Sequence, residues 1–390
     1  MKGKFRLTLL ASALAVGSFG LTANNVALAS DGVEKAAGAT EKARYLSGKQ
    51  SRATIAARQK WFGLDNVNPN TGAVRTDRVI MSWAGVSTFA ASFNGHVVML
   101  DGYLAYARSG TWGNSKKYIS TDYEEYAALN PEMYLFGHGH GDHMGHTVQI
   151  LELLPTLQMY GMAEHCNDIK ARMAPTPVNC TSILAAGAPF GSEATVPVNM
   201  IPGVEARAVK HPHSAGPLDK VNDPPFSTEQ AVVRPCIAYS QFPPDGTEPS
   251  SFGGPTSGVL SFSWQFKFVG TNFALGWADT TGDISGNRAV PGLGTGAEVP
   301  PVYATWPHTN VLFGSIAVSP RRVFGQQIAA IEPQLFIPIH HDPCAFDVKV
   351  ELDGEVEKLP DALKPQVWYI SDPGDYHRPI VFDPKSPAWN

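Results

Sequence analysis

The chain is poor in charge, has no basic cluster, and has no long apolar run beyond its N-terminal segment. Charged side chains make up 17% of the 390 residues, and the formal net charge is -5. Because nucleic-acid-binding surfaces need clustered Lys and Arg, this composition argues against a nucleic-acid substrate. No later segment has the unbroken apolar length of a membrane span, so we expect no stable membrane insertion.

Cysteines are also few, and none of the four has C-x-x-C spacing. A redox motif or a cysteine-bound zinc site is therefore not expected. In an oxidising compartment, an even number of cysteines is consistent with disulfides. Cys166 and Cys180, separated by a short Pro-containing segment, are the most plausible pair, which would leave Cys236 with Cys344. Other connectivities are possible, and the sequence does not choose between them.

The N-terminus has the form of a secretory signal peptide. Three basic residues precede an apolar stretch from Leu7 to about Leu21, and Ala27-Leu28-Ala29 follows as a small-x-small cleavage site. A membrane anchor is less favoured because the apolar core is short and broken by Gly and Ser. We predict that residues 1–29 are a signal peptide and that the mature protein is periplasmic or secreted.

The mature chain divides into an arm and a body. Residues 30–77 are rich in Ala, Lys, Glu and Gln at their start and predict an N-terminal helical arm that serves packing. Residues 78–390 form the body, which opens on strand patterns joined by an Asn94-Gly95 hairpin turn. Within it, residues 215–257 are rich in Pro and Gly, and so long a loop favours a lid or a substrate-pocket wall over a passive insertion.

One stretch carries the strongest chemical signal. Met133-Tyr134-Leu135-Phe136 is typical of a buried strand, and the apolar residues of 147–154 have helical spacing. Between them, His138, His140, Asp142 and His143 form the pattern H-x-H-x-D-H, interleaved with glycines. A histidine-rich loop that binds metal adventitiously is the alternative. Three His and one Asp on a strand-to-helix turn favour a built metal site.

Three further strand patterns end on side chains that can bind metal. Residues 204–209 lead into His211 or His213, residues 273–278 lead into Asp279, and residues 335–339 lead into His340 or His341. Each ion of a two-metal site needs nitrogen and oxygen ligands with an open position, and one carboxylate bridges the pair. Two divalent ions are therefore expected; this ligand set suits zinc best, and manganese or iron would accept it.

Several other polar or aromatic residues have both a structural and a functional interpretation. Asp101, at a strand end, is favoured as a structural carboxylate that holds the neighbouring turn rather than as a ligand. His146 is expected on the helix after the motif, either in a structural role or exposed to solvent. His308 is a hypothetical proton donor in the substrate pocket. Three aromatic residues either shape an apolar pocket or belong to the core: Trp83, Tyr103 and Trp277.

Taken in order, these motifs resemble the metallo-β-lactamase superfamily, and among its branches the metal-dependent hydrolases similar to L-ascorbate-6-phosphate lactonase. The resemblance runs from about residue 79 to 345 and rests on short stretches, of which only the third is highly specific: Trp83-Ala84-Gly85-Val86-Ser87-Thr88, Val98-Met99-Leu100-Asp101-Gly102, Gly137-His138-Gly139-His140-Gly141-Asp142-His143, His213-Ser214-Ala215-Gly216, Ala278-Asp279-Thr280-Thr281-Gly282 and Ile337-Pro338-Ile339-His340. It implies an α/β (α+β) fold, an αββα sandwich of two mixed β-sheets flanked by helices, with the site at one edge.

The resemblance also implies how the ligands divide. One metal would be held by His138, His140 and His213, the other by Asp142, His143 and His340, with Asp279 bridging both. His213 is preferred to His211 because family members place this ligand directly before a small-polar, Gly-containing turn. His340 is preferred to His341 because it is the first residue after the strand, where the family's last ligand lies.

The expected reaction follows from two metals and one bridging hydroxide. The hydroxide would attack a carbonyl carbon or a phosphorus atom of a small-molecule ester, lactone or phosphodiester, and Asp142 would orient it and accept its proton. The alternatives are an iron-dependent oxidoreductase or dioxygenase, or a β-lactamase, on the same fold. The export signal, the arm, the long loop and an extension from about residue 346 depart from the resembled branch, so they leave the substrate open. The oligomeric state cannot be read from the sequence.

Overall fold

The structure, a computed structural model, describes most of the body and part of the arm. It describes residues 26–28, 48–104, 123–194, 196–197, 199–213, 260–286, 289–316, 324–341, 348–370, 375 and 377–390. The loop predicted at 215–257, the proposed Cys236–Cys344 pair and all of the predicted signal peptide except Val26–Leu28 lie outside these residues.

The first sheet is built mostly from the first half of the chain. Within the described residues it has eight strands, antiparallel from β1 to β4 and parallel from β4 to β7. The order is β1 (Val26–Leu28), β17 (Ile380–Phe382), β2 (Val79–Trp83), β3 (Phe89–Phe93), β4 (His96–Leu100), β5 (Met133–Leu135), β6 (Gln158–Met162) and β7 (Asn179–Leu184). Asn94 and Gly95 have positive φ in the predicted hairpin turn between β3 and β4.

The second sheet follows the same plan, with antiparallel strands at one side and parallel strands at the other. Its seven described strands are ordered β16 (Gln366–Val367), β15 (Leu335–Ile339), β14 (Val311–Ser315), β11 (Ala274–Ala278), β10 (Leu260–Phe268), β9 (Val204–Pro212) and β8 (Glu193–Ala194). Pairing is parallel from β11 to β16 and antiparallel from β8 to β11. A separate ribbon joins β12 (Ala289–Val290) to β13 (Gly294–Thr295).

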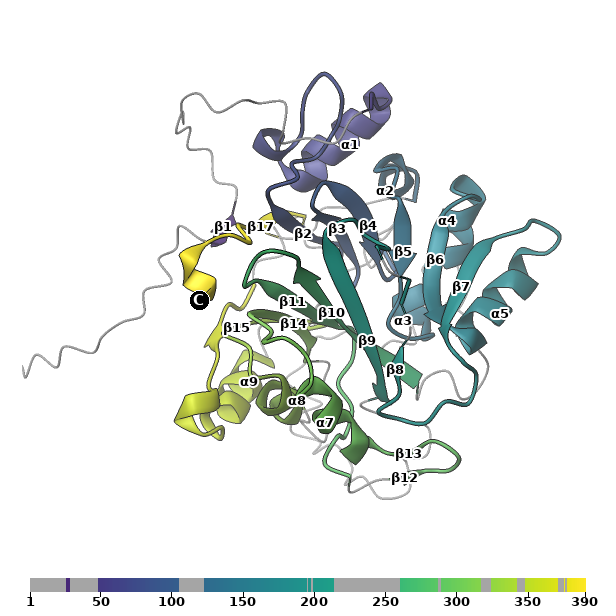
Figure 1. The fold of residues 1–390 in the computed structure, drawn as a ribbon. Coiled ribbons are helices and arrows are strands. Elements are labelled where there is room, and N and C mark those ends of the chain that lie inside the picture. The colour runs from purple at the N-terminus through teal and green to yellow at the C-terminus, as the bar shows by residue number, and fades with distance from the viewer. Residues whose placement is uncertain are drawn as a thin grey trace, which may run out of the picture.

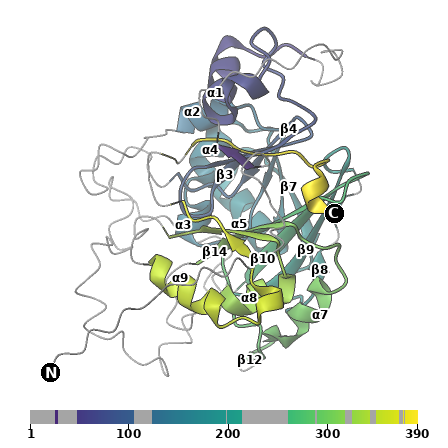
Figure 2. The ribbon, with the colours of Figure 1, turned by 90° about the vertical axis from the view of Figure 1, so that its left-hand side faces the viewer.

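Helices cover the outer face of each sheet, as Figures 1 and 2 show. The first sheet packs against α1 (Arg52–Phe62), α2 (Tyr123–Ala128), α4 (Thr147–Leu153) and α5 (Ala163–Met173). The second sheet packs against α8 (Phe324–Ile331) and α9 (Val348–Glu357), with α7 (Val299–Tyr303) beside them. The largest apolar cluster fills the space between the two sheets. The predicted αββα sandwich of two mixed sheets is therefore confirmed.

Aromatic residues fill the layer between the sheets. Trp83, Tyr103 and Trp277 are at most 2% exposed and belong to the core that both sheets share. The alternation of apolar and polar residues along β10 places its apolar side chains toward that core: Leu260, Phe262, Trp264, Phe266 and Phe268. The sequence predicts either a core or a pocket-wall position for Trp83, Tyr103 and Trp277, and the structure places all three in the core.

The arm is anchored by α1. Trp61 and Phe62 of α1 are fully buried, and the Trp61 ring lies 5.3 Å from Tyr126 of α2 and 4.4 Å from His377. Ser51 caps α1 by accepting a hydrogen bond from Thr54 N. The helix is thus held to the first sheet by tertiary packing.

The segment after residue 346, which the sequence places in the body as a departure from the resembled branch, adds a strand to each sheet. β16 extends the second sheet, and β17 inserts between β1 and β2 of the first. Trp389, 3% exposed, then packs its ring 4.9 Å from Phe273. The extension after residue 346 is therefore integral to the sandwich.

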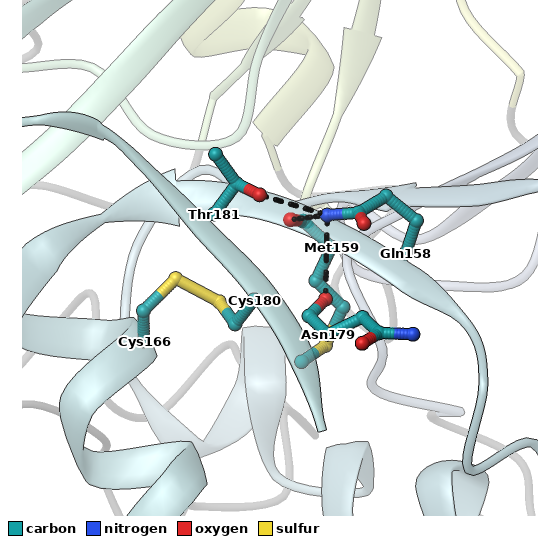
Figure 3. Close-up of a disulfide and its surroundings, with 6 residues drawn as sticks. All are labelled: Gln158, Met159, Cys166, Asn179, Cys180 and Thr181. Carbon is teal, nitrogen blue, oxygen red and sulfur yellow. Dashed lines mark hydrogen bonds between the residues drawn. A yellow bond between two sulfur atoms is a disulfide. The ribbon is translucent and has the colours of Figure 1, made fainter. Parts of the chain in front are cut away.

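The predicted disulfide is present between Cys166 of α5 and Cys180 of β7, with Cα atoms 5.4 Å apart (Figure 3). It ties the helix to the edge strand of the first sheet, next to the ladder that joins β6 and β7. Among the residues that the structure describes, no helix has the length and apolar character that crossing a membrane requires.

Candidate metal centre

The H-x-H-x-D-H motif leaves the first sheet at the end of β5. His138 follows the strand, His140 is the N-cap of the short helix α3 (Gly141–Met144), and Asp142 and His143 lie in that helix. The second sheet meets the motif here, because Phe262 N donates to Gly137 O at 2.9 Å. The strand-to-helix turn predicted from the sequence is present, with α3 as an additional helix.

The other predicted ligands arrive from the second sheet. His213 follows β9, Asp279 follows β11 and His340 follows β15. These three strands run in the same direction, since β9 and β11 are both antiparallel to β10 while β11, β14 and β15 are parallel. Their carboxyl ends therefore share one edge, which is the edge that β5 also reaches.

All seven predicted ligands come together at this edge. Their nitrogen and oxygen atoms form three overlapping groups, each within 4.8 Å: His138 with His140 and His213, His138 with His143 and Asp279, and Asp142 with His143 and His340. The first and last groups match the division that the family resemblance implies. The middle group joins them, because it shares one histidine with each.

The first group is a set of three imidazoles. His138 Nε2 lies 3.1 Å from His140 Nδ1. The ring of His213 lies 4.7 Å from that of His138 and 4.6 Å from that of His140. His138 is fully buried while the other two are partly exposed, so this group opens toward solvent on one side.

The last of the three groups, Asp142 with His143 and His340, combines two imidazoles with a carboxylate. It is called the second group below, and the group of three imidazoles is called the first. His340 Nε2 lies 3.2 Å from His143 Nε2 and 3.3 Å from Asp142 Oδ2. His143 Nε2 is 3.8 Å from the other oxygen of the same carboxylate. Asp142 is partly exposed, whereas both histidines are buried.

Asp279 lies between the two groups and is fully buried. Its Oδ2 atom lies 2.6 Å from His138 Nδ1 and 3.5 Å from His143 Nδ1. Its Oδ1 atom has no hydrogen-bond partner among the described residues. A buried carboxylate oxygen without a partner is costly unless a cation or a water satisfies it.

Two glycines make room for this arrangement. A β-carbon on Gly137 would lie 2.0 Å from Asp279 Cγ, and one on Gly282 would lie 1.6 Å from Pro212 O. Real β-carbons do not approach other atoms so closely, so each position requires Gly. The glycines beside His138 and after Asp279 thus allow β5, β9 and β11 to converge.

The charges of the cluster suit metal binding. Burial lowers the pKa of His138 and of His140, so both imidazoles are neutral at pH 7, as ligands must be. Burial opposes ionisation of Asp142, but His143 and His340 outweigh it and lower its pKa. Burial, followed by repulsion from Asp101, raises the pKa of Asp279. A divalent cation beside Asp279 would favour the carboxylate form.

The competing histidines lie outside the three groups. His211 is buried and its Nδ1 atom lies 2.9 Å from Pro212 O, while His341 Nε2 lies 2.8 Å from Ile370 O. His146 is buried at the start of α4, and its Nδ1 accepts from Leu104 N at 3.0 Å, which fits the structural role expected. His308 is exposed and belongs to none of the groups.

Asp101 has the structural position that the sequence favoured. Its Oδ1 accepts from Gly137 N at 3.0 Å, and its Oδ2 lies 2.9 Å from His143 Nδ1. Ser87 joins the same contact, with its Oγ 2.5 Å from Asp101 Oδ2 and 2.6 Å from His143 Nδ1. Sequence reasoning assigned no role to Ser87. Its only signal was its place in one of the stretches that carry the family resemblance.

The residues present fit a pair of metal ions. Ligands that share a tetrahedral zinc at about 2.0–2.1 Å lie roughly 3.4 Å apart. The closest donor pairs of the two outer groups, at 3.1, 3.2 and 3.3 Å, are near this spacing. Neutral imidazoles, an ionised Asp142 and the unpartnered oxygen of Asp279 supply nitrogen and oxygen donors only, the set that zinc, manganese or iron accepts.

Comparison with known proteins gives structural likenesses at low identity. No family model and no curated protein matches the chain. Similar solved structures include Igni18, a metallo hydrolase from Ignicoccus hospitalis, at 16% identity and TM-score 0.44, covering 78% of this chain and 98% of that one. The metallo-β-lactamase fold protein YhfI from Bacillus subtilis has 9% identity and TM-score 0.41, with coverages of 76% and 97%.

A third likeness is to CmlA, a diiron β-hydroxylase from Streptomyces venezuelae, at 12% identity and TM-score 0.41, covering 78% of this chain and 54% of that one. At such identities and scores these likenesses carry no conclusion about chemistry. The chain itself shows an αββα sandwich with His and Asp groups at one edge that could hold metal ions.

Proposed function

We propose that this chain is an exported metal-dependent hydrolase of the metallo-β-lactamase superfamily, with a dinuclear site that is best suited to zinc. One observation supports this most directly. Seven nitrogen- and oxygen-bearing side chains from two sheets form two three-ligand groups that Asp279 connects. Four strand ends from the two sheets deliver these side chains to one edge.

The reaction proposed is hydrolysis of an ester, lactone or phosphodiester bond in a small molecule. When bound, two divalent ions would supply a water ionised at neutral pH and would stabilise negative charge that develops on the substrate. The chain's own residues must then orient the nucleophile, take its proton and keep the ligand histidines neutral.

Asp142 is the residue proposed to accept the proton of the attacking water. Its carboxylate is partly exposed at the open side of the cluster, whereas Asp279 and Asp101 are fully buried. Because His143 and His340 lower its pKa, Asp142 is ionised at pH 7 and can accept a hydrogen bond. His340 Nε2 lies 3.3 Å from Asp142 Oδ2, so both can face the same ion.

Export is proposed on the N-terminal pattern and is supported by the disulfide. The three-part pattern of residues 1–29 is that of a signal peptide. Cleavage after Ala29 would remove β1 (Val26–Leu28) and leave β17 as the edge strand of the first sheet. The bond between Cys166 and Cys180 fits an oxidising compartment such as the periplasm or the extracellular space.

The experiment that tests this proposal is elemental analysis of the purified protein beside an Asp142→Ala, His143→Ala double variant. We expect about two metal ions per chain, with the double variant losing at least one. His308→Ala is the control, because His308 is an exposed histidine outside all three groups and should leave the metal content unchanged.

Metal identity then decides between reaction classes. Zinc, together with turnover of esters, lactones or phosphodiesters in a substrate screen, supports the hydrolase. Iron as the bound metal would move the assignment to oxidative chemistry. A well-folded protein that contains no metal and takes up none on addition would refute the proposal.

Activity gives a second test through Asp142 alone. Asp142→Asn removes the proton acceptor but preserves size, and we expect kcat to fall by about 10²–10⁴-fold. Hydrolysis at an unchanged rate would exclude Asp142 as the proton acceptor.

A further inference from the structure

The turn between β2 and β3 is held by groups from both sheets. Val86 has a φ of +51°, which is rare for a β-branched residue and marks a strained backbone. Its carbonyl accepts from Trp83 Nε1 at 2.9 Å and from His340 N at 2.8 Å. The next carbonyl, of Ser87, accepts from Trp277 Nε1 at 3.2 Å. The backbone of Ser87 is therefore fixed between the sheets.

The side chain of Ser87 completes a triangle of short contacts. Ser87 Oγ lies 2.5 Å from Asp101 Oδ2 and 2.6 Å from His143 Nδ1, and these last two atoms lie 2.9 Å apart. All three residues are at most 1% exposed. With water excluded, the protons of the triangle must find acceptors among these three side chains and Asp279, whose Oδ2 lies farther away, 3.5 Å from His143 Nδ1.

The donors and acceptors of the triangle can be assigned. A serine hydroxyl has one proton to donate and lone pairs to accept with, whereas a carboxylate only accepts. The hydroxyl of Ser87 therefore donates to Asp101 Oδ2, and its oxygen accepts from the Nδ1–H of His143. Asp101 is held in place from its other oxygen by Gly137 N at 3.0 Å.

This assignment fixes both the tautomer and the orientation of His143. With the proton on Nδ1, the lone pair lies on Nε2, the atom that faces His340 Nε2 at 3.2 Å and Asp142 Oδ1 at 3.8 Å. We propose that Ser87 is a positioning residue, which holds the His143 ring and its Nδ1 proton so that Nε2 points into the second ligand group. The effect of Ser87 on metal affinity rests on the proposed function, whereas its effect on the orientation of the His143 ring does not.

The same turn also supports the other histidine of that group. His340 has a φ of +64°, and its N–H donates to Val86 O, one residue before Ser87. One turn thus orients His143 through a side chain and His340 through the backbone. The contacts described for His138 and His140 of the first group do not include Ser87, so we expect a change at this serine to act mainly on the second group.

The chain offers a matched control in Ser92. It lies on β3, is fully buried, and its Oγ has no hydrogen-bond partner among the described residues. Ser92→Ala therefore removes a buried hydroxyl from the same sheet without removing a contact to the site, and should be close to neutral.

The first measurement is made on metal-free protein labelled with ¹⁵N-histidine. In the wild type we expect an imidazole Nδ1–H signal from His143 that is protected from exchange with water, assigned by its loss in His143→Gln. Ser87→Ala should lose this protection, Ser87→Thr should restore it, and Ser92→Ala should retain it. Persistence of the protected signal in Ser87→Ala would overturn the proposal.

The second measurement is competition between the protein and a chelator for zinc. Ser87→Ala should lower the affinity for one of the two ions by about 10–100-fold, the usual effect of removing a group that orients a ligand histidine. The other ion, and both ions in Ser92→Ala, should bind as in the wild type. Equal weakening of both ions, or the same loss in Ser92→Ala, would show a general loss of structure and overturn the proposal.

The two measurements separate this proposal from the function on which it builds. If the wild type binds no metal, the proposed hydrolase is wrong, yet the Nδ1–H signal still tests Ser87. If metal binds but the signal is insensitive to Ser87, the hydrolase stands and the positioning role is wrong.

Discussion

Gly137 occupies a position at which the fold has no space for a β-carbon. The Cγ atom of Asp279 would lie 2.0 Å from it, and Asp279 Oδ2 also contacts His138 Nδ1. In Gly137→Ala, Asp279 must therefore move by more than 1 Å to reach ordinary van der Waals distance, a rough figure from contact radii. We expect metal affinity to fall by at least about 10-fold, measured by chelator competition.

The control is the same substitution at Gly354, in the middle of α9, where no atom lies within 4 Å of the added carbon. Replacing an exposed helical Gly by Ala should stabilise the protein by about 0.5–1 kcal/mol and leave metal binding unchanged. Normal metal affinity in Gly137→Ala would show that Asp279 does not need its present position.

His377 should make stability depend on pH although it lies outside the ligand groups. Its ring is buried against Trp61, and burial, with Lys60 as a smaller cause, lowers its pKa to about 3. The folded state thus keeps His377 neutral while the unfolded chain binds a proton below about pH 6.5. Its contribution is complete above pH 6.5 and is lost as the pH falls toward 3.

The loss from this one residue is on the order of a few kcal/mol. In His377→Phe, which keeps a ring beside Trp61, the free energy of unfolding should fall less steeply between pH 6.5 and 4. Urea unfolding over a pH series measures this slope, with His308→Phe at an exposed position as the control. An unchanged slope in His377→Phe would contradict the interpretation.

At the scale of elements, α5 is fastened to β7 by a covalent bond. Cys166 and Cys180 are separated by 14 residues, and closing a loop of that size stabilises a folded protein by about 3 kcal/mol. The Cys166→Ala, Cys180→Ala double variant should unfold at a correspondingly lower urea concentration. Both cysteines lie outside the ligand groups, so metal content should be unchanged. An unaltered midpoint would show that the bond adds nothing to stability.

The elements that could be predicted from the sequence are those with strong local patterns. β10 alternates Leu, Phe and Trp with polar residues over nine positions, and Asn94-Gly95 is a strong turn signal for the hairpin between β3 and β4. By contrast, α3 has four residues and β17 three, too few for any periodicity. β7 was also missed, because its sequence, Asn-Cys-Thr-Ser-Ile-Leu, does not alternate apolar with polar residues. Short elements of this kind form only because their neighbours hold them.

The site divides in the same way. His138, His140, Asp142 and His143 could be recognised because four ligands lie within one short stretch after a strand pattern. The choice of His213 and His340 over their neighbours came from the family resemblance, and both stand in the groups that the structure forms. The role proposed for Ser87 depends on contact with a residue 56 positions away, for which the sequence holds no local signal.

At the scale of the whole molecule, the last residues close the core. Trp389 packs against Phe273 and Phe382, and its Nε1 donates to Asp383 O at 2.7 Å. Trp389→Ala should cost about 3–5 kcal/mol, the range for removing a buried aromatic side chain. Denaturant unfolding measures the cost. Leu64→Ala, at a side chain that is 72% exposed, should change stability by no more than about 0.5 kcal/mol.

The position of β17 has a consequence for how the chain is made. A ribosome releases β2 early, but the partner that covers its free edge, Ile380–Phe382, is synthesised roughly 300 residues later. At about 5–20 residues per second, that edge is exposed for some tens of seconds. An unpaired edge can pair with another nascent chain. We therefore expect this edge of β2 to be prone to pairing with other chains until Ile380–Phe382 covers it.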